Sequence, residues 1–165
     1  MNPVLNAKTQ QTVHPDSTWP PLLDCAVKEV FQMMVHTDLT AMPDTGAGEP
    51  AGDTTAMVGL AGALCGVLSI RCTSRVAESI AGKMLGSTGA VQSSDIADAI
   101  AEICNMVAGN FKSKISMLGE HCMLSVPTVI RGDDYEMVSL ADGEHIVICL
   151  GYDGSPVWIC LELHS

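Results

Sequence analysis

The sequence predicts an α+β domain in two layers, with long helices packed on one face of a largely antiparallel sheet. The first observation is the order of the segments, which runs helix, hairpin, two helices and then several strands. The second is the composition: the 165 residues fit one domain, and 47% of them are hydrophobic but only 4% are aromatic. Aliphatic side chains and ten methionines must therefore fill the core, which suits closely stacked helices and strands.

The beginning of the chain is expected to be a flexible lead-in, because residues 1–19 are polar and contain prolines. A single domain is predicted over 20–165. Its first helix starts at the Pro20-Pro21 pair, since a first helical turn tolerates proline. Apolar residues then recur at helical spacing as far as about His36. The next stretch, 37–53, is rich in glycine and proline and is predicted to be a loop.

Two apolar runs broken by glycines over 54–72 predict a β-hairpin. A second helix is predicted over 74–85, with Ser74 as its N-cap and Gly86 in the position after its end. After a Ser/Gly turn, a longer helix is predicted over 94–115.

The rest of the chain is predicted to form strands that are separated by glycine- and aspartate-containing turns. Among these turns, Asp153-Gly154 is a strong hairpin signal. The expected strands span 121–130, 135–140, 145–151 and 156–163, and the pattern is weakest at 135–140.

Charge and composition exclude several classes of partner. Eight Lys and Arg oppose 19 Asp and Glu, which gives a formal charge of −11. Nucleic acid and anionic membrane surfaces are therefore disfavoured as partners. No apolar run is long enough to span a bilayer and no signal peptide is recognisable, so a cytoplasmic protein is expected. The histidines and cysteines lack metal-ligand spacing, so no metal or cofactor of the protein's own is expected.

The seven cysteines are an odd number and include no C-x-x-C pair. Most of them lie in apolar runs, where a free thiol packs as a small hydrophobe. Buried free thiols in a reducing compartment are therefore expected. A thiol-based redox sensor is a weaker hypothesis, because Cys104 lies near the core-facing side of its helix and has no basic neighbour in sequence.

The helix predicted over 94–115 contains the candidate site. At about 100° per residue, its side chains form two opposed stripes. The apolar stripe, which should face the core, consists of Ile96, Ile100, Ile103, Val107 and Phe111. The second stripe, called the exposed stripe below, consists of Asp98, Glu102, Asn105, Gly109 and Lys112. Glu102 and Asn105 should therefore project together from a rigid scaffold.

An E-x-x-N pair on a helix is usually no more than solvated surface. Asparagine, however, competes for backbone hydrogen bonds inside a helix, and Gly109 costs about 1 kcal/mol relative to alanine. Two helix-weakening residues on the exposed stripe indicate a function. Asn105 would supply its amide group, and Gly109 would allow the close approach of a partner's backbone.

The segment D-A-I-A-E-I-C-N-M-V-A-G-N at 98–110 resembles the signature helix of the CheC, CheX and FliY phosphatase family, in which E-x-x-N is followed by Gly-Asn. The segment 125–132 is similar to the family's proline-containing strand downstream of that helix. The hairpin over 58–69 and the helix that ends at Met84-Leu85-Gly86 also fit. The resemblance covers most of 20–163 and implies a CheC-like fold.

This resemblance implies a phosphatase that hydrolyses the aspartyl-phosphate of a CheY-type response regulator. Glu102 would pair with a lysine of the receiver domain, and Asn105 would enter the receiver's active site and orient the attacking water. Asp98, Gly109 and Lys112 would belong to the surface that binds the partner, and the receiver would supply Mg²⁺. The residue types suit the chemistry, because phosphoryl transfer depends on positioning and a neutral amide can both accept and donate hydrogen bonds.

CheC-type relatives have two E-x-x-N helices, whereas CheX-type relatives have one. In the 74–85 helix, Glu78 matches the motif but Ala81 stands in the place of Asn. One active site of the CheX type is therefore expected. Members of that type dimerise by joining sheets, so a homodimer is implied. The strand expected at 156–163 is apolar enough to need a cover.

The main alternative is a non-catalytic module that docks a receiver domain or a flagellar switch component. Such a module would keep Glu102 and the acidic face but would have little use for Asn105. Asn105 therefore favours the enzyme.

Overall fold

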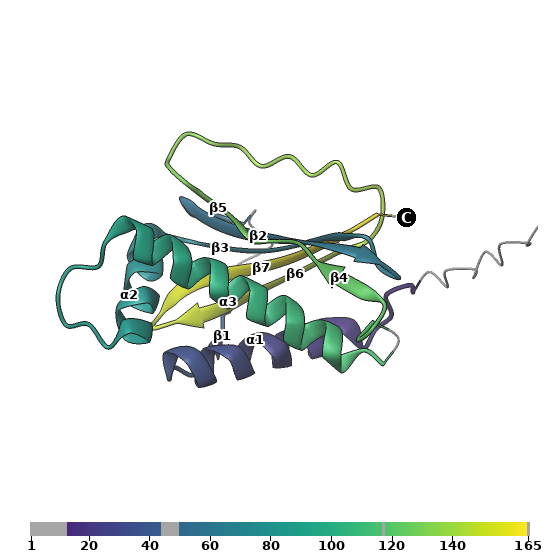
Figure 1. The fold of residues 1–165 in the computed structure, drawn as a ribbon, viewed down its shortest axis with the longest axis horizontal. Helices are drawn as coiled ribbons and strands as arrows, with labels where there is room; N and C mark the ends of the chain where they lie inside the picture. The colour runs from purple at the N-terminus through teal and green to yellow at the C-terminus, as the bar shows by residue number, and fades with distance from the viewer. Residues whose placement is uncertain (1–12, 44–49, 117, 165) are drawn as a thin grey trace, which may run out of the picture.

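The computed structural model describes residues 13–43, 50–116 and 118–164, and it has the predicted two-layer architecture (Figure 1). Three helices of the described chain lie on one face of an antiparallel sheet: α1 (Trp19–Val35), α2 (Ser74–Leu85) and α3 (Ser93–Lys114). The strands are β1 (Thr40–Ala41), β2 (Thr54–Gly62), β3 (Gly66–Cys72), β4 (Cys122–Leu124), β5 (Thr128–Arg131), β6 (His145–Tyr152) and β7 (Ser155–Leu163). Their order is β1-β6-β7-β3-β2, and both β4 and β5 pair with β2.

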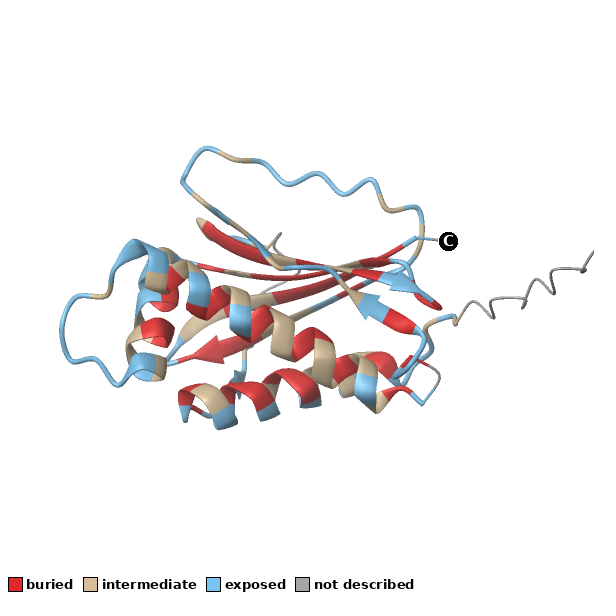
Figure 2. Ribbon diagram, in the orientation of Figure 1, coloured by how far each residue is buried: buried red, intermediate tan, exposed pale blue. Residues whose placement is uncertain are grey.

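The core lies between the helices and the sheet, as Figure 2 shows by the buried residues on the surfaces where the two layers meet. Helix α1 has prolines in its first turn and ends at His36, whose left-handed conformation (φ 53°) stops it. Its Trp19 ring packs edge-on against Phe111 of α3, with ring centroids 5.7 Å apart. The first helix and the hairpin over 54–72 are confirmed.

The N-cap of α2 is Thr73 and not the expected Ser74. Strand β3 ends at Cys72, so Thr73 already has the extended conformation that an N-cap needs. Its side-chain oxygen accepts a hydrogen bond from the Val76 N–H at 3.3 Å. Gly86, with φ 62°, ends the helix as predicted.

The strand expected over 121–130 is interrupted, because β4 and β5 are separate and Ser125–Pro127 lies between them. The strand expected over 135–140 is absent from the described residues, and that segment belongs to a loop. The loop crosses the face of the sheet opposite the helices, called the outer face below (Figure 1). Tyr135 fixes its start, because the Tyr135 hydroxyl lies 2.7 Å from the Thr55 hydroxyl. A tertiary contact therefore replaces the expected strand pairing.

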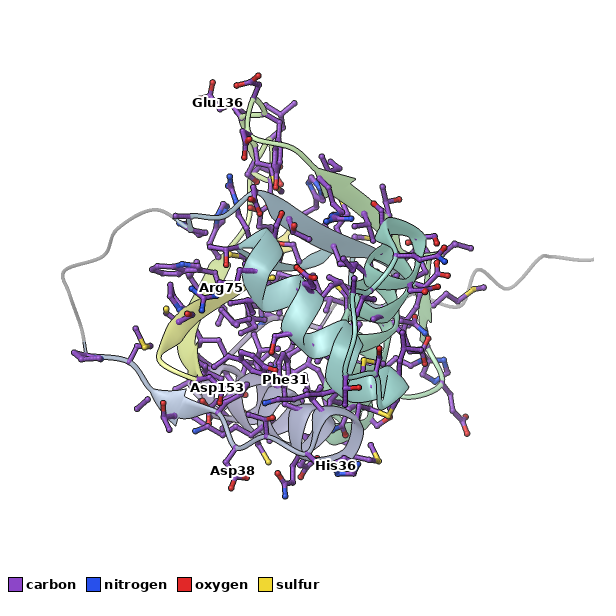
Figure 3. The ribbon with its side chains drawn as sticks, turned by 90° about the vertical axis from the view of Figure 1, so that its left-hand side faces the viewer. Phe31, His36, Asp38, Arg75, Glu136 and Asp153 are labelled. Atoms are coloured by element: carbon purple, nitrogen blue, oxygen red, sulfur yellow. The ribbon has the colours of Figure 1, made fainter. Side chains whose placement is uncertain are left out.

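Figure 3 shows the same arrangement from the side. Glu136 of the outer-face loop lies at the opposite end of the molecule from His36 and Asp38, which follow α1. Asp153 marks the turn of the β6–β7 hairpin, where φ is positive at both Asp153 (47°) and Gly154 (82°). Positive φ at both positions is the geometry of a type I′ turn, so this hairpin is confirmed.

Two other features of the sheet differ from expectation. The loop predicted over 37–53 contains the short strand β1, which pairs with β6 and is too short to show a pattern. Strand β7 lies between β3 and β6, and not at an edge. The apolar character of 156–163 is therefore explained by its central position, and the strand needs no cover from outside the chain.

Candidate functional site

Helix α3 positions the candidate site. Its first turn contains Asp95 and its last turn contains Lys112 and Lys114. The charges at both ends interact favourably with the helix dipole and stabilise the helix. The five residues of the apolar stripe are all buried, as predicted. The helix is thus held by its inner side, and the exposed stripe is left as a stable surface.

The exposed stripe places Glu102 and Asn105 one turn apart. Asp98 and Glu102 are exposed, while Asn105 is half-buried. Among the residues that the structure describes, neither Glu102 nor Asn105 has a hydrogen-bond or ion-pair partner for its side chain. A carboxylate and an amide are therefore available together for an external group.

Gly109 lies one turn beyond Asn105 and is half-buried. A Cβ atom at this position would meet nothing nearer than Leu124 Cδ1, at 4.0 Å, which is an ordinary van der Waals contact. The packing of this fold therefore does not require glycine at 109, and the helix would be more stable with alanine.

Lys112 is held by the protein itself. Its Nζ donates a hydrogen bond to the Cys122 carbonyl at 2.8 Å, and this bond connects α3 to β4. The bond positions the edge of the sheet beside the helix, and it uses one of the three donors of the ammonium group, so a contact of Lys112 with a partner stays a prediction.

Asn110 is a residue to which the sequence analysis gave no role of its own. Its Nδ2 donates to Glu29 Oε2 of α1 at 2.8 Å, and Lys114 Nζ lies 2.7 Å from the same carboxylate oxygen. These contacts, with that of Cys25, lower the pKa of Glu29 to about 2, and the Lys114 contact has the largest effect. Asn110 therefore anchors the helix of the site to its neighbour.

The second helix offers no further copy of the pair. Glu78 is exposed on α2, but Ala81, in the place of the motif's asparagine, is completely buried. An asparagine there would lie in the core, so the α2 segment is a structural helix and one E-x-x-N pair remains.

All seven cysteines are free, as predicted, but they are not all buried. Burial raises the pKa of the Cys72 and Cys104 thiols to about 12, which makes them poor nucleophiles. Cys25 and Cys65 are exposed, contrary to expectation. Cys25 is exposed because it lies on the solvent-facing side of α1. There its Sγ donates to Glu29 Oε1 at 3.3 Å.

Among the described residues, no three His, Cys, Asp or Glu side chains are arranged to hold a metal ion. No described helix is both long and apolar enough to cross a membrane. One pocket of about 720 Å³ lies on the outer face, and another of about 390 Å³ is lined by His14, Asp142 and His164. Neither pocket is lined by a residue of α3.

The fold and the site together define a two-layer α+β domain that presents one carboxylate–amide pair on an exposed helix face. A pair in such a position is accessible to a group that a macromolecular partner presents. The family model described as "Chemotaxis phosphatase CheX" matches residues 54–150. This match covers more than half of the chain, and the chain belongs to that family.

Similar proteins agree with this assignment. The CheY-P phosphatase CheX of Thermotoga maritima is 32% identical over 84 residues, which are 50% of this chain and 54% of the relative. The match thus spans about half the length of that relative. The chemotaxis protein CheX from Vibrio vulnificus has a TM-score of 0.78 at 20% identity, over 92% of this chain and 100% of the other.

A third similar structure is the CheX–CheY–BeF3–Mg²⁺ complex from Borrelia burgdorferi. Its TM-score is 0.73 at 20% identity, and the match covers 89% of this chain and 98% of the other. At these identities the solved structures show the fold, which is the CheC-like fold that the sequence predicts.

Proposed function

We propose that this protein is a phosphatase that hydrolyses the aspartyl-phosphate of a CheY-type response regulator. One observation carries the proposal: Glu102 and Asn105 stand one turn apart on a rigid helix, with no partner for either side chain among the described residues. The family to which the chain belongs and its similarity to the CheY-P phosphatase CheX of Thermotoga maritima support the same reaction.

Asn105 is proposed to orient the attacking water. Its carbonyl oxygen can accept a hydrogen bond from water while its NH₂ group donates to a neighbouring oxygen. The amide is neutral, so it can approach an anionic phosphoryl group where a carboxylate would be repelled. Phosphoryl transfer passes through a loose transition state, and the main task of the protein is to position the water in line with the bond that breaks.

Glu102 is proposed to form an ion pair with a lysine of the receiver domain. Its carboxylate is exposed and has no cation partner among the described residues, so pairing with the receiver breaks no contact that the structure shows. Asp98 lies one turn before Glu102 and is also exposed. The two carboxylates would attract a basic side chain, and Gly109 would let the partner's backbone approach the helix.

Mg²⁺ is proposed to come from the receiver and not from this chain. The Borrelia burgdorferi structure is a complex of CheX with CheY, BeF3 and Mg²⁺, which supports a metal that enters with the partner. In that role the cation would neutralise charge on the phosphoryl oxygens. The residues of this chain would contribute the water-orienting amide and the docking carboxylate.

The remaining features of the proposal concern the state of the protein. Residues 20–165 would form a single domain preceded by a lead-in, in the cytoplasm, and the resemblance implies a homodimer formed by joined sheets. The described edges of the sheet are β1 on one side and β4 with β5 on the other. A joined sheet would use one of these edges and not the central strand β7.

The test is to mix the purified protein with a phosphorylated receiver domain and Mg²⁺ and to follow the release of phosphate. The wild-type protein should accelerate phosphate release above the receiver's own rate, and Glu78→Ala on α2 should do so equally. Binding without any acceleration would contradict the enzyme and would support the docking module.

A further inference from the structure

The larger pocket, called the outer-face pocket below, is a hollow of about 720 Å³ between the sheet and the outer-face loop over 132–144 (Figure 1). Its floor consists of side chains on the outer face of β2, β3 and β7, and its walls are the loop and the segment 50–52 that leads into β2. Pockets of this size commonly hold small molecules, with an apolar lining and a few placed polar groups. The polar groups of the lining therefore indicate what the pocket binds.

Arg71 is held in a fixed position in the floor of the outer-face pocket. Its Nε donates to the Gly52 carbonyl at 2.9 Å, and its guanidinium carbon lies 5.1 Å from the centre of the Tyr135 ring. The second contact is a cation–π interaction. Neither Nη group has a partner among the described residues. Arg71 therefore presents a positioned and unneutralised charge to the pocket.

The wall beside Arg71 requires a glycine. Gly52 has a φ of 144°, which side chains rarely allow, and a Cβ atom there would overlap the carbonyl group of Cys72 at the end of β3. Only glycine lets the chain pass so close to β3 and place its carbonyl beside the guanidinium. The backbone of 50–52 is thus shaped to hold Arg71.

Glu162 supplies an opposite charge at a distance. Trp158 stands directly opposite Arg71, and Glu162 lies about 13 Å further along β7. Both Arg71 and Glu162 are half-buried and line the pocket, yet no ion pair joins them and Glu162 has no partner among the described residues. Partly buried charges without partners are costly, so a ligand that contacts both would stabilise them. Glu136 lines the loop wall as a second carboxylate, which disfavours a purely anionic ligand.

The floor between the two charges is uncharged. Cys160 lies between Trp158 and Glu162 on β7, directly opposite Ser69 of β3. Burial raises the pKa of the Cys160 thiol to about 11, so it is neutral near pH 7. Met137 and Val138 of the loop add apolar surface to the wall. The pocket therefore offers a cation, an apolar middle and a carboxylate.

We infer that the outer-face pocket binds a small zwitterion, whose carboxylate pairs with Arg71 and whose ammonium group pairs with Glu162. The planar guanidinium matches the geometry of a carboxylate. An extended tripeptide is about 10 Å long, so its two charged ends could reach both side chains while its middle side chain packs against Met137. A short peptide with free ends is the ligand class that this lining fits. The inference is independent of the proposed phosphatase activity, because α3 contributes no residue to the pocket.

The test is calorimetric titration of the full chain with the tripeptide Ala-Leu-Ala, and with the same peptide either acetylated at its amino end or amidated at its carboxyl end. The peptide with free ends should bind with a Kd of about 0.1 mM. Each blocked peptide should bind about tenfold more weakly, because it lacks one of the two charges. Absence of saturable binding up to about 10 mM would overturn the inference, and so would equal Kd values for the free and acetylated peptides.

Two variants assign each charge to its partner. Glu162→Gln should raise the Kd of the free peptide about tenfold and leave that of the acetylated peptide unchanged, because the pair is already lost there. Arg71→Gln should act in the same way with the amidated peptide. Arg75→Gln, on the exposed side of α2, should change none of these values. Thermal unfolding checks that the variants fold, and if Arg71→Gln does not, Glu162→Gln still decides. Equal weakening of the free and acetylated peptides by Glu162→Gln would overturn the inference.

Discussion

Asn110 Nδ2 lies 2.8 Å from Glu29 Oε2, and this hydrogen bond ties α3 to α1 next to the candidate site. Asn110 directly follows Gly109 of the exposed stripe. One member of the Gly-Asn pair therefore lies on the candidate docking surface, and the other binds the neighbouring helix. The pair connects the site to the scaffold that positions it, so a change at Glu29 should affect stability before it affects chemistry.

Glu29→Gln should lower the free energy of unfolding at neutral pH, and the difference from the wild type should shrink in acid. The pKa of Glu29 is lowered from 4.5 to about 2 by Lys114 first and then by Asn110 and Cys25. A carboxyl group with a depressed folded-state pKa stabilises the fold above its unfolded-state pKa. That contribution is lost as the pH falls from about 4.5 towards about 2. Urea unfolding at several pH values measures it.

The control for this series is Glu136→Gln, since Glu136 lies on the outer-face loop far from α1. Its unfolding free energy should follow that of the wild type at every pH. A gap between Glu29→Gln and the wild type that stays constant down to about pH 2 would show that the charge of Glu29 does not stabilise the fold.

Gly109→Ala should stabilise the protein and weaken its binding to the receiver. The fold leaves room for the added methyl group, with Leu124 Cδ1 at 4.0 Å. Alanine is favoured over glycine in a helix interior by about 1 kcal/mol. The same methyl group would block the close approach of a partner's backbone. Thermal unfolding and the Kd for a receiver domain loaded with beryllium fluoride and Mg²⁺ measure the two effects.

Gly82→Ala is the matched control, because Gly82 lies within α2 and its Cβ would meet Val91 Cγ2 at 3.7 Å. It should give a similar gain in stability with an unchanged Kd. If Gly109→Ala binds the receiver as well as Gly82→Ala does, no partner backbone approaches the helix at that position.

The helices and the candidate pair could be predicted because their signals are local. The apolar stripe of α3 follows from a repeat of 3.6 residues, and the β6–β7 hairpin follows from Asp153-Gly154. Other features depend on contacts that the sequence does not place together. The Asn110–Glu29 bond joins residues 81 positions apart, and the Tyr135–Thr55 contact joins residues 80 positions apart. The periodic patterns of the sequence do not indicate contacts between residues so far apart in the chain.

The errors have similar causes. One extra residue between β4 and β5 leaves the apolar pattern of 121–130 intact, yet it breaks the ladder. Apolar neighbours in sequence predict that the thiols are buried, but a helix exposes one of its sides, and Cys25 lies on that side of α1. Thr73 and Ser74 are both good caps by type, and only the end of β3 decides between them.

Alkylation of the native protein should modify Cys25 and Cys65 first. Both thiols are exposed, whereas Cys72 and Cys104 are buried and their pKa values are raised to about 12. A thiol with such a pKa forms almost no thiolate at neutral pH and therefore reacts slowly. Mass spectrometry of protein treated with iodoacetamide, before and after unfolding, identifies the modified residues. Fast modification of Cys104 in the native state would indicate that α3 opens from the sheet.

Asn105→Ala should remove most of the phosphatase activity and leave affinity for the loaded receiver nearly intact. The proposed role of the amide is to orient water in the transition state, and the loss of such a positioned group costs about 10²–10³ in rate. The substitution should not disturb the fold, because Asn105 is half-buried and its side chain has no partner among the described residues. Single-turnover phosphate release and the Kd for the receiver with beryllium fluoride separate the two effects.

Glu102→Ala should weaken binding as well as turnover, and the loss should be larger at low salt. The proposed ion pair with a receiver lysine exists before the reaction, so it contributes to the ground-state complex. Charges at a partly exposed interface are screened over about 30 Å at 0.01 M salt but over about 10 Å at 0.1 M. The Kd should therefore rise about tenfold at the lower salt concentration and less at the higher one.

Glu78→Ala, which removes an exposed carboxylate from α2, controls for net charge. If Glu102→Ala and Glu78→Ala raise the Kd equally, the effect is general electrostatic steering and not a specific pair. If Asn105→Ala instead loses affinity in parallel with Glu102→Ala and shows no separate defect in rate, then α3 is a docking surface and not an active site.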